Sequence, residues 1–178
     1  MNYSAIAVRY SKALFSLTEE KGILEEVHND IALINSVCET EPEFKRFLDF
    51  PVIASTKKFE VLNQIFADKV NKVTLEFLQL VAKSRRESFL PIMAKDFQNL
   101  YKAKKGIKTV TFTSVNKIND SVRKEIREIL RGKYGADIEI IEQTNNELIG
   151  GFVLRIDDEQ YDASIASQLE NIKRSFKA

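Results

Sequence analysis

The sequence predicts a mainly α-helical protein: a six-helix antiparallel bundle at the N-terminal end, followed by a small α+β domain with the element order β-α-β-β-α. Apolar residues recur at helical spacing from Ser4 to Lys104, in segments separated by short loops. Beyond a basic, glycine-containing segment at 102–108, the pattern changes to the alternation of a half-buried strand. These two observations predict domains at 1–105 and 106–178.

The first helix is predicted over Ser4 to Glu20, and it carries two apolar stripes instead of one. One stripe holds Ile6, Tyr10, Ala13, Leu14 and Leu17, while Val8 and Phe15 lie nearly opposite. A central helix buried on two sides explains this pattern. The sequence alone favours that interpretation, and the alternative is a helix with one stripe in the core and the other facing a partner helix.

A second helix is predicted over the apolar residues from Leu24 to Val37, which mark a single face. His28 has no second histidine or cysteine at ligand spacing, so we expect a solvated surface residue and not a metal site. Cys38 is the chain's single cysteine, so it cannot form an intramolecular disulfide. We expect it to be a small packing residue.

Four more helices complete the predicted bundle. A short third helix has Pro42 in its first turn, and Ser55 is the expected N-cap of the fourth. The fifth spans Val73 to Lys83, and the sixth spans about 88–104. Apolar residues cover more than half the circumference of the fifth helix, so the first and fifth helices both carry more apolar surface than one core face requires.

The C-terminal domain begins with a strand over 109–113, in which Val110 and Phe112 point inward. A helix opens at Asn119 or Asp120 and ends near the glycines at 132–135. Its predicted inward-facing residues are Val122, Ile126, Ile129 and Leu130. A second strand begins at Ile138, and Asn145-Asn146 turns the chain toward a third.

The third strand is predicted to contain Gly150 and Gly151, which allow either a bulge or the close approach of another element. The acids at 157–159 are expected to break the strand, and Asp162 or Ser164 to cap a final helix. The apolar residues of that helix are Ile165, Leu169, Ile172 and Phe176.

No motif for catalysis or for a cofactor is visible. The glycine pair lacks the context of a phosphate-binding loop, and no nucleophile stands at a recognisable spacing from a base. The acids at 157–162 lack a calcium-loop pattern, so a polar turn and helix cap is favoured. We therefore expect no catalytic residue, no cofactor and no metal.

Charge and hydropathy limit the classes of partner that the chain is expected to bind. Lys+Arg 27 against Asp+Glu 26 gives a net charge of +1, so no overall field attracts nucleic acid or an anionic membrane. No apolar run approaches the length of about 20 residues that a membrane span needs, and no targeting signal is visible. We expect a soluble protein that reaches any membrane through partners.

Four segments together resemble one protein family. They are Val8–Phe15, then 47–53 followed by Lys57-Lys58, then Phe77-Leu78-x-Leu80, and finally 148–154 followed by Tyr161–Ile165 and Leu169. In this order they are similar to the delta subunit family of F-type ATP synthase, called the oligomycin-sensitivity-conferring protein in mitochondria.

The resemblance implies a non-catalytic stator subunit in the peripheral stalk. Such a subunit links the catalytic alpha/beta head to the membrane sector through the b subunits, so that ion translocation is coupled to ATP synthesis. It implies that a groove between the first and fifth helices holds the N-terminal helix of an alpha subunit, and that the C-terminal domain binds the C-termini of the b subunits. The expected groove residues are Ile6, Tyr10, Ala13, Phe77 and Leu80, and the signature residues are Gly150, Gly151, Asp162 and Ser164.

The implied setting is the cytoplasmic face of a bacterial inner membrane. The chain would be a peripheral monomer within a hetero-oligomeric complex, with no direct membrane insertion and no nucleic acid. An alternative is a cytosolic helical interaction module or a nucleic-acid adapter that uses the lysines at 102–108. A helix C-terminus followed by a hinge explains those lysines better, because they lack interleaved aromatic residues.

Overall fold

A computed structural model describes residues 3–146, 148–156 and 159–175 of the chain. It is mainly helical, with a sheet in the C-terminal part, as the sequence predicts at this level. The sheet has four strands. The chain divides into two compact units, Met1–Tyr101 and Lys102–Ala178, a few residues before the predicted boundary.

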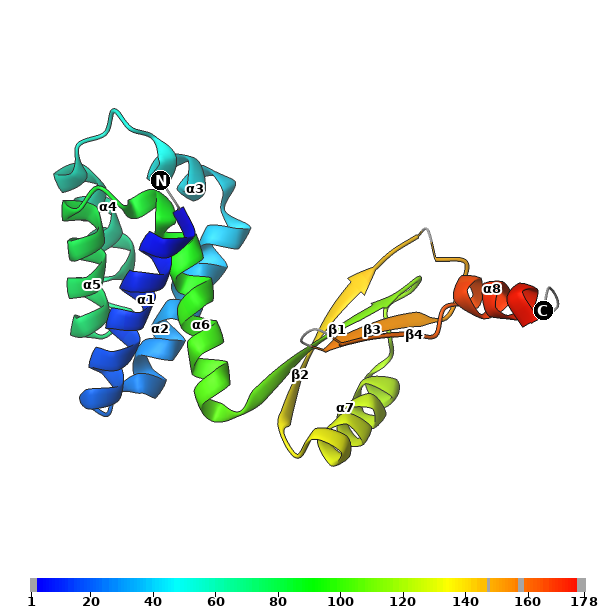
Figure 1. The fold of residues 1–178 in the computed structure, drawn as a ribbon. Helices are drawn as coiled ribbons and strands as arrows, with labels where there is room; N and C mark the ends of the chain where they lie inside the picture. The colour runs from blue at the N-terminus through cyan, green and yellow to red at the C-terminus, as the bar shows by residue number, and fades with distance from the viewer. Residues whose placement is uncertain (1–2, 147, 157–158, 176–178) are drawn as a thin grey trace. The chain divides into compact units, whose positions relative to one another are not determined.

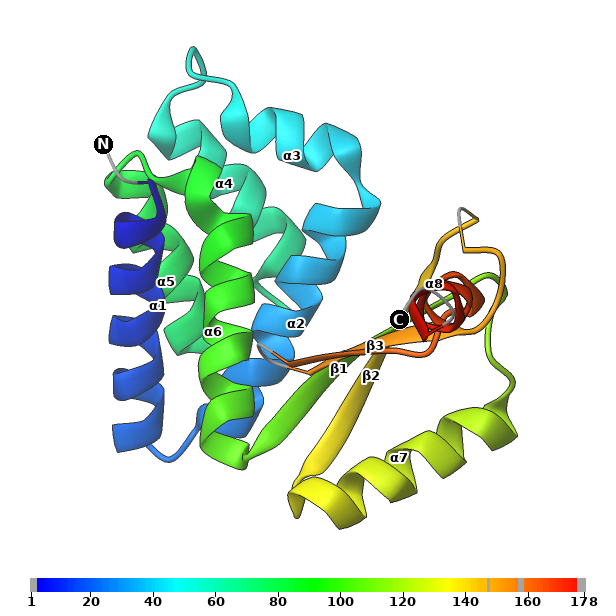
Figure 2. The ribbon, with the colours of Figure 1, turned by 45° about the vertical axis from the view of Figure 1, so that its right-hand side comes forward.

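Unit 1 is built from α-helices joined by short connections (Figure 1). The elements are α1 Tyr3–Glu20, α2 Leu24–Thr40, α3 Pro42–Asp49, α4 Ser55–Phe66, α5 Lys72–Lys83, the 3-10 helix η1 Glu87–Phe89, and α6 Leu90–Lys105. In both views α1 lies beside α5 and α6 (Figures 1 and 2). The sixth helix was predicted to begin at about residue 88, but the residues there form the 3-10 helix η1, and α6 begins at Leu90.

One apolar core holds unit 1 together. Residues at helical spacing on α2, such as Val27, Ile31 and Ile34, are buried, and they pack with Phe66 and Phe97. Cys38 belongs to this core, which confirms that it is a packing residue. Its burial, with a smaller effect from Glu39, raises the pKa of the thiol to about 11, so the thiol stays protonated at neutral pH.

Two sequence-based expectations for unit 1 are wrong. His28 is half-buried and not a solvated residue, because its ring stacks on Tyr101 of α6 with 3.7 Å between the centroids. Ser55 is the first helical residue of α4 and not its N-cap, because the chain turns into the helix one residue earlier than predicted. The cap position is Ala54, whose side chain makes no capping hydrogen bond.

A buried ion pair joins three elements of unit 1. Lys58 of α4 places its Nζ 2.7 Å from Glu87 Oε1 of η1, and it also donates to the carbonyl of Leu48 in α3 at 2.7 Å. Only 2% of Lys58 and 6% of Glu87 are exposed. Charges taken out of water this fully are stable only as partners of one another, so the pair fixes how these elements pack.

Unit 2 contains β1 Ile107–Ser114, α7 Asp120–Tyr134, β2 Asp137–Thr144, β3 Phe152–Ile156, β4 Glu159–Asp162 and α8 Ile165–Ser175. The strand order in the sheet is β2-β1-β3-β4. β1 pairs in parallel with β2 after the α7 crossover, and it pairs antiparallel with β3. The parallel pair requires the crossover, because a short hairpin cannot join parallel strands.

The order in unit 2 is therefore β-α-β-β-β-α, and the predicted β-α-β-β-α order is wrong. The additional strand is β4, which pairs antiparallel with β3 at the edge of the sheet. All four of its residues are exposed, so it lacks the apolar alternation by which a half-buried strand is predicted. The predicted strand break at 157–158 and the side chains of Ile172 and Phe176 lie outside the described residues.

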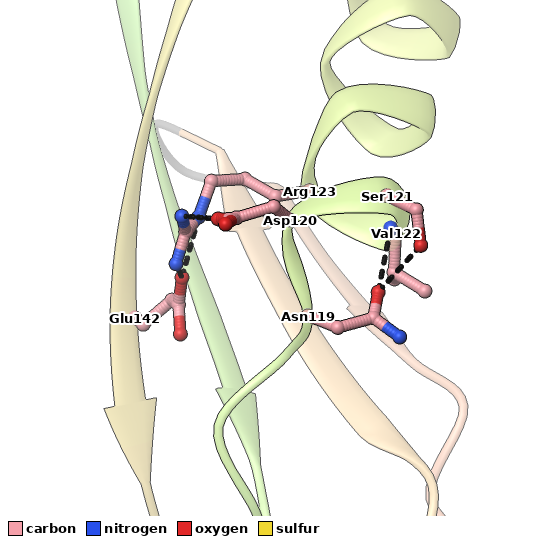
Figure 3. A network of polar contacts seen from close by, with 6 residues as sticks. All are labelled: Asn119, Asp120, Ser121, Val122, Arg123 and Glu142. Carbon is pink, nitrogen blue, oxygen red and sulfur yellow. Dashed lines mark hydrogen bonds and ion pairs between the residues drawn. The ribbon is translucent and has the colours of Figure 1, made fainter.

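Helix α7 is held at its start by polar contacts (Figure 3). Asn119 is the N-cap, and its side-chain oxygen accepts from the backbone N–H of Val122 at 2.9 Å. Arg123 pairs with Asp120 and also with Glu142 of β2, which ties α7 to the sheet. Of the two possible helix openings, the structure therefore selects Asn119 as the cap and Asp120 as the first helical residue.

A small core lies between α7 and the sheet, formed by Val110, Leu130, Ile138 and Ile156. Two residues predicted to face inward do not do so: Val122 is 38% exposed and Ile129 is 62% exposed. Helical spacing placed them on the apolar stripe of α7, but that stripe is wider than the part of the sheet that the helix covers. No other described element packs over Ile129.

Candidate partner-binding groove

Helices α1 and α5 form the walls of an apolar groove with a volume of about 190 Å³. The lining residues are Tyr10, Ala13, Leu14, Leu17, Val73, Glu76, Phe77 and Leu80. Leu14 and Phe77 are buried at its base, whereas Leu17 and Leu80 remain 40% and 53% exposed. Exposed leucines beside a groove on two adjacent helices form a surface that another apolar element can cover.

Four of the five expected groove residues line this groove together, namely Tyr10, Ala13, Phe77 and Leu80. Ile6 does not line it; this residue is half-buried and packs against the core of unit 1. Sequence reasoning did not select Val73 and Glu76. Their spacing to Leu80 in steps of three or four residues was the signal that could have found them.

A buried carboxylate on α2 fixes the start of α5. Asp30 is 8% exposed, and its Oδ2 accepts from the backbone N–H of Asn71 at 2.8 Å and from the Thr74 hydroxyl at 2.6 Å. Asn71 is itself the N-cap of α5. The positive end of the α5 dipole and these donors compensate the buried charge of Asp30, so the wall of the groove is anchored to the core.

The other wall is anchored through Ser11. Its hydroxyl lies 2.7 Å from Asp96 Oδ2 on α6 and is fully buried. Because Ser11 follows Tyr10 directly and precedes Ala13 by two residues, this bond fixes the rotation of α1 and keeps both groove residues turned toward α5. Polar contacts to α6 and α2 therefore fix the two helices that form the groove, on the side away from its opening.

The chemistry of the groove suits binding and not catalysis. Its only lining charge is Glu76, whose exposed carboxylate lies 4.0 Å from Lys72 one turn earlier. Within the described ranges, no cluster of three or more histidine, cysteine or acidic residues could hold a metal ion. None of the described helices is both long enough and apolar enough to cross a membrane.

The glycine pair marks the second predicted site. Gly150 and Gly151 precede β3 and do not lie inside a strand, so the predicted bulge is wrong and the predicted close approach is right. Gly151 has a φ of +79°, and a Cβ atom built there would lie 2.3 Å from the carbonyl oxygen of Ala163. Only glycine fits this position, because both the conformation and the space exclude a side chain.

Asp162 and Ser164 together cap α8. Ser164 Oγ accepts from the backbone N–H of Ser167 at 3.2 Å, and Asp162 accepts from the Ser164 N–H at 2.8 Å and from the Ser167 hydroxyl at 2.7 Å. The sequence offered these residues as alternatives, and the structure uses both. Hydrogen bonds from Ser167 first, and then from Ser164, hold the pKa of Asp162 below its usual value.

The lowered pKa of Asp162 predicts a pH-dependent effect of Asp162→Ala. Its contribution to stability is present above the unfolded-state pKa of about 3.9 and is lost as the pH falls through the lower folded-state pKa. We therefore expect Asp162→Ala to be less stable than wild type at pH 7, with a gap that narrows below about pH 4. Urea unfolding of both proteins across this range measures the gap, and a constant gap would contradict this role.

Comparison with known proteins decides the family. The family model described as "ATP synthase delta (OSCP) subunit" matches residues 6–176. The chain belongs to this family. It is 34% identical over 176 residues to the ATP synthase subunit delta of Cytophaga hutchinsonii, which covers 99% of the chain and 96% of that protein. It is also 34% identical to the ATP synthase subunit delta of Carboxydothermus hydrogenoformans, with 99% of each chain covered.

A solved structure agrees with this assignment. A chain in the cryo-EM structure of the Toxoplasma gondii mitochondrial ATP synthase hexamer matches with a TM-score of 0.75 and 25% identity, over 97% of both chains. As a delta/OSCP family member, the protein is a structural, non-catalytic component of the ATP synthase peripheral stalk. The family assignment therefore supports the stalk subunit as the function of the chain.

Proposed function

We propose that the groove between α1 and α5 binds the N-terminal helix of an ATP synthase alpha subunit. The observation that carries this proposal is the groove itself, with leucines 40% and 53% exposed on facing walls above a buried base. An amphipathic helix covers such a surface with residues one helical turn apart. The two apolar stripes of α1 then have separate roles, one in the core and one in the interface.

Two groove residues have distinct roles in this proposal. Ala13 is exposed and small, so the backbone of a bound helix can approach α1 closely at that point. Tyr10 is half-buried, and its ring supplies apolar area while its hydroxyl can reach the polar rim of the interface. Tyrosine with this placement is a frequent hot spot in protein interfaces.

The proposed role of the whole chain is mechanical. Residues 1–105 act as one antiparallel helical bundle that holds the catalytic alpha/beta head, and residues 106–178 bind the C-termini of the b subunits. Torque from the central shaft acts on the head, and this connection keeps the head from turning with the shaft. Ion flow is thereby coupled to ATP synthesis at the cytoplasmic face of the bacterial inner membrane, where the chain is a single peripheral copy.

Tyr10→Ala tests the groove. We expect the variant to bind a synthetic peptide of the alpha subunit N-terminus about 1–3 kcal/mol more weakly than wild type, because the ring is lost from the interface. Isothermal titration of the full chain measures the affinity. Lys12→Ala is the matched control, since Lys12 is exposed on the same helix and does not line the groove, and its affinity should equal that of wild type. Equal affinity of a folded Tyr10→Ala variant would remove Tyr10 from the interface.

A further inference from the structure

One acidic residue stands among the apolar residues that line the groove between α1 and α5. Glu76 is the single charged residue of that lining, and all the others are uncharged. Its side chain is 59% exposed, whereas Leu14 and Phe77 are buried at the base of the groove. The carboxylate therefore belongs to the rim of the α5 wall, and any helix that covers the groove passes beside it.

The carboxylate of Glu76 is held only weakly by its own helix. Its Oε1 atom lies 4.0 Å from Nζ of Lys72, whose side chain is 88% exposed. An exposed pair adds little to stability, and lysine four residues before glutamate is the less favourable order on a helix. The described residues of α1 that line the groove are a tyrosine, an alanine and two leucines, so none of them is cationic. The carboxylate can therefore pair with a cation that a partner brings.

A helix that docks in the groove removes water from one side of the Glu76 carboxylate. An apolar residue beside it would leave a charge partly desolvated, and an acidic residue would add repulsion. A lysine or an arginine would instead compensate the charge. Charged residues that flank an apolar seam between helices set partner choice and orientation in this way. The apolar residues of the groove accept any amphipathic helix, whereas Glu76 distinguishes among such helices.

The two walls of the groove differ in how closely a helix can approach them. Ala13 on the α1 wall is exposed and small, so the backbone of a docked helix can come close to α1 there. On the α5 wall the exposed side chains are those of Glu76 and Leu80, which are both longer. Lysine and arginine suit the wider α5 side, because their aliphatic stems can lie on an exposed leucine while the charged group reaches a carboxylate.

We propose that Glu76 is a specificity-determining residue of the groove, and that it selects an amphipathic helix with a lysine or arginine on the flank that faces α5. This inference rests on the proposed binding of the alpha subunit's N-terminal helix, and it names the charge that the helix carries beside its apolar stripe. Because the pair lies at an exposed rim, it acts on the choice of partner and on the association rate more than on the final affinity.

Calorimetric titration of the full chain with the synthetic alpha-subunit peptide, at about 0.05 M and about 1 M salt, tests the role of Glu76. We expect Glu76→Gln to bind about three- to fivefold more weakly than wild type at low salt, because an exposed ion pair is lost. At high salt the two affinities should be equal, since screening removes the contribution of the pair. Glu60→Gln is the matched control with the same net charge. Glu60 is exposed on α4 and does not line the groove, so this variant should bind as wild type does.

Reversal of the charge identifies the partner's residue. Glu76→Lys should weaken binding of the peptide about tenfold or more at low salt, because attraction becomes repulsion. Peptides in which each lysine or arginine in turn is replaced by glutamate are then titrated against wild type and Glu76→Lys. We expect one of them to recover binding to Glu76→Lys while it binds wild type more weakly, which is the coupling that a double-mutant cycle measures.

Equal affinity of wild type and Glu76→Gln at low salt would overturn the role of Glu76, and so would a loss of the same size at both salt concentrations. Failure of every charge-reversed peptide to recover binding to Glu76→Lys would also overturn it. Absence of peptide binding by the folded wild-type chain would instead contradict the proposed function, and the role of Glu76 with it. Circular dichroism and thermal unfolding establish that each variant is folded.

Discussion

Replacing Lys58 with alanine is expected to lower the free energy of unfolding by about 3–5 kcal/mol. The substitution removes the ammonium group that lies 2.7 Å from Glu87 and leaves the carboxylate of Glu87 buried without a counter-charge. It also leaves the carbonyl of Leu48 without its donor. Because the pair joins α3, α4 and η1, the loss acts on the packing of unit 1 and not on one helix alone. Urea unfolding followed by circular dichroism measures the effect.

Two controls separate the buried pair from a general effect of removing a lysine. Lys57→Ala changes the exposed neighbour and should alter the free energy of unfolding by less than about 0.5 kcal/mol. The double variant Lys58→Met with Glu87→Leu removes both charges and should recover much of the loss, because no buried charge remains unpaired. A loss below about 1 kcal/mol in Lys58→Ala would show that the pair is not buried as described.

Gly151→Ala is expected to destabilise unit 2 by about 2–5 kcal/mol. A left-handed backbone costs a residue with a Cβ about 1–2 kcal/mol, and overpacking costs about 1–3 kcal/mol. Both apply here, because φ is +79° and the new methyl group would lie 2.3 Å from a backbone oxygen that cannot rotate away. The turn that starts α8 must shift to make room for the methyl group.

The matched control is Gly132→Ala, in α7 of the same unit. Nothing lies within 4 Å of a Cβ at Gly132, and alanine stabilises a helix interior by about 1 kcal/mol relative to glycine. The two glycine-to-alanine changes should therefore shift the thermal unfolding temperature in opposite directions. A stable Gly151→Ala variant with an unchanged unfolding temperature would mean that the chain does not make this close approach.

The sequence was most informative where spacing alone decides the structure. The excess apolar surface on 4–20 and 73–83 follows from a period of 3.6 residues, and these are the two helices whose faces meet at the groove. The close approach at Gly151 was one of the two alternatives that the glycine pair allowed. The binding role of Tyr10 and its neighbours stays a prediction until it is measured.

The features that spacing missed depend on neighbours far along the chain. β4 has no apolar pattern, because it is an exposed edge strand that exists only through its pairing with β3. His28 was expected in solvent because its own segment is polar, whereas Tyr101, 73 residues later, covers its ring. Ile129 was expected in the core because its helix face is apolar, but no described element covers that part of the face.

We propose that this chain holds the catalytic head through the groove between α1 and α5. The measurement to make is calorimetric titration of the full chain with a peptide of the alpha subunit N-terminus, repeated at several temperatures. We expect one-to-one binding with a negative heat-capacity change, because an apolar helix face is buried against α1 and α5. Absence of binding by the folded chain would contradict the proposal.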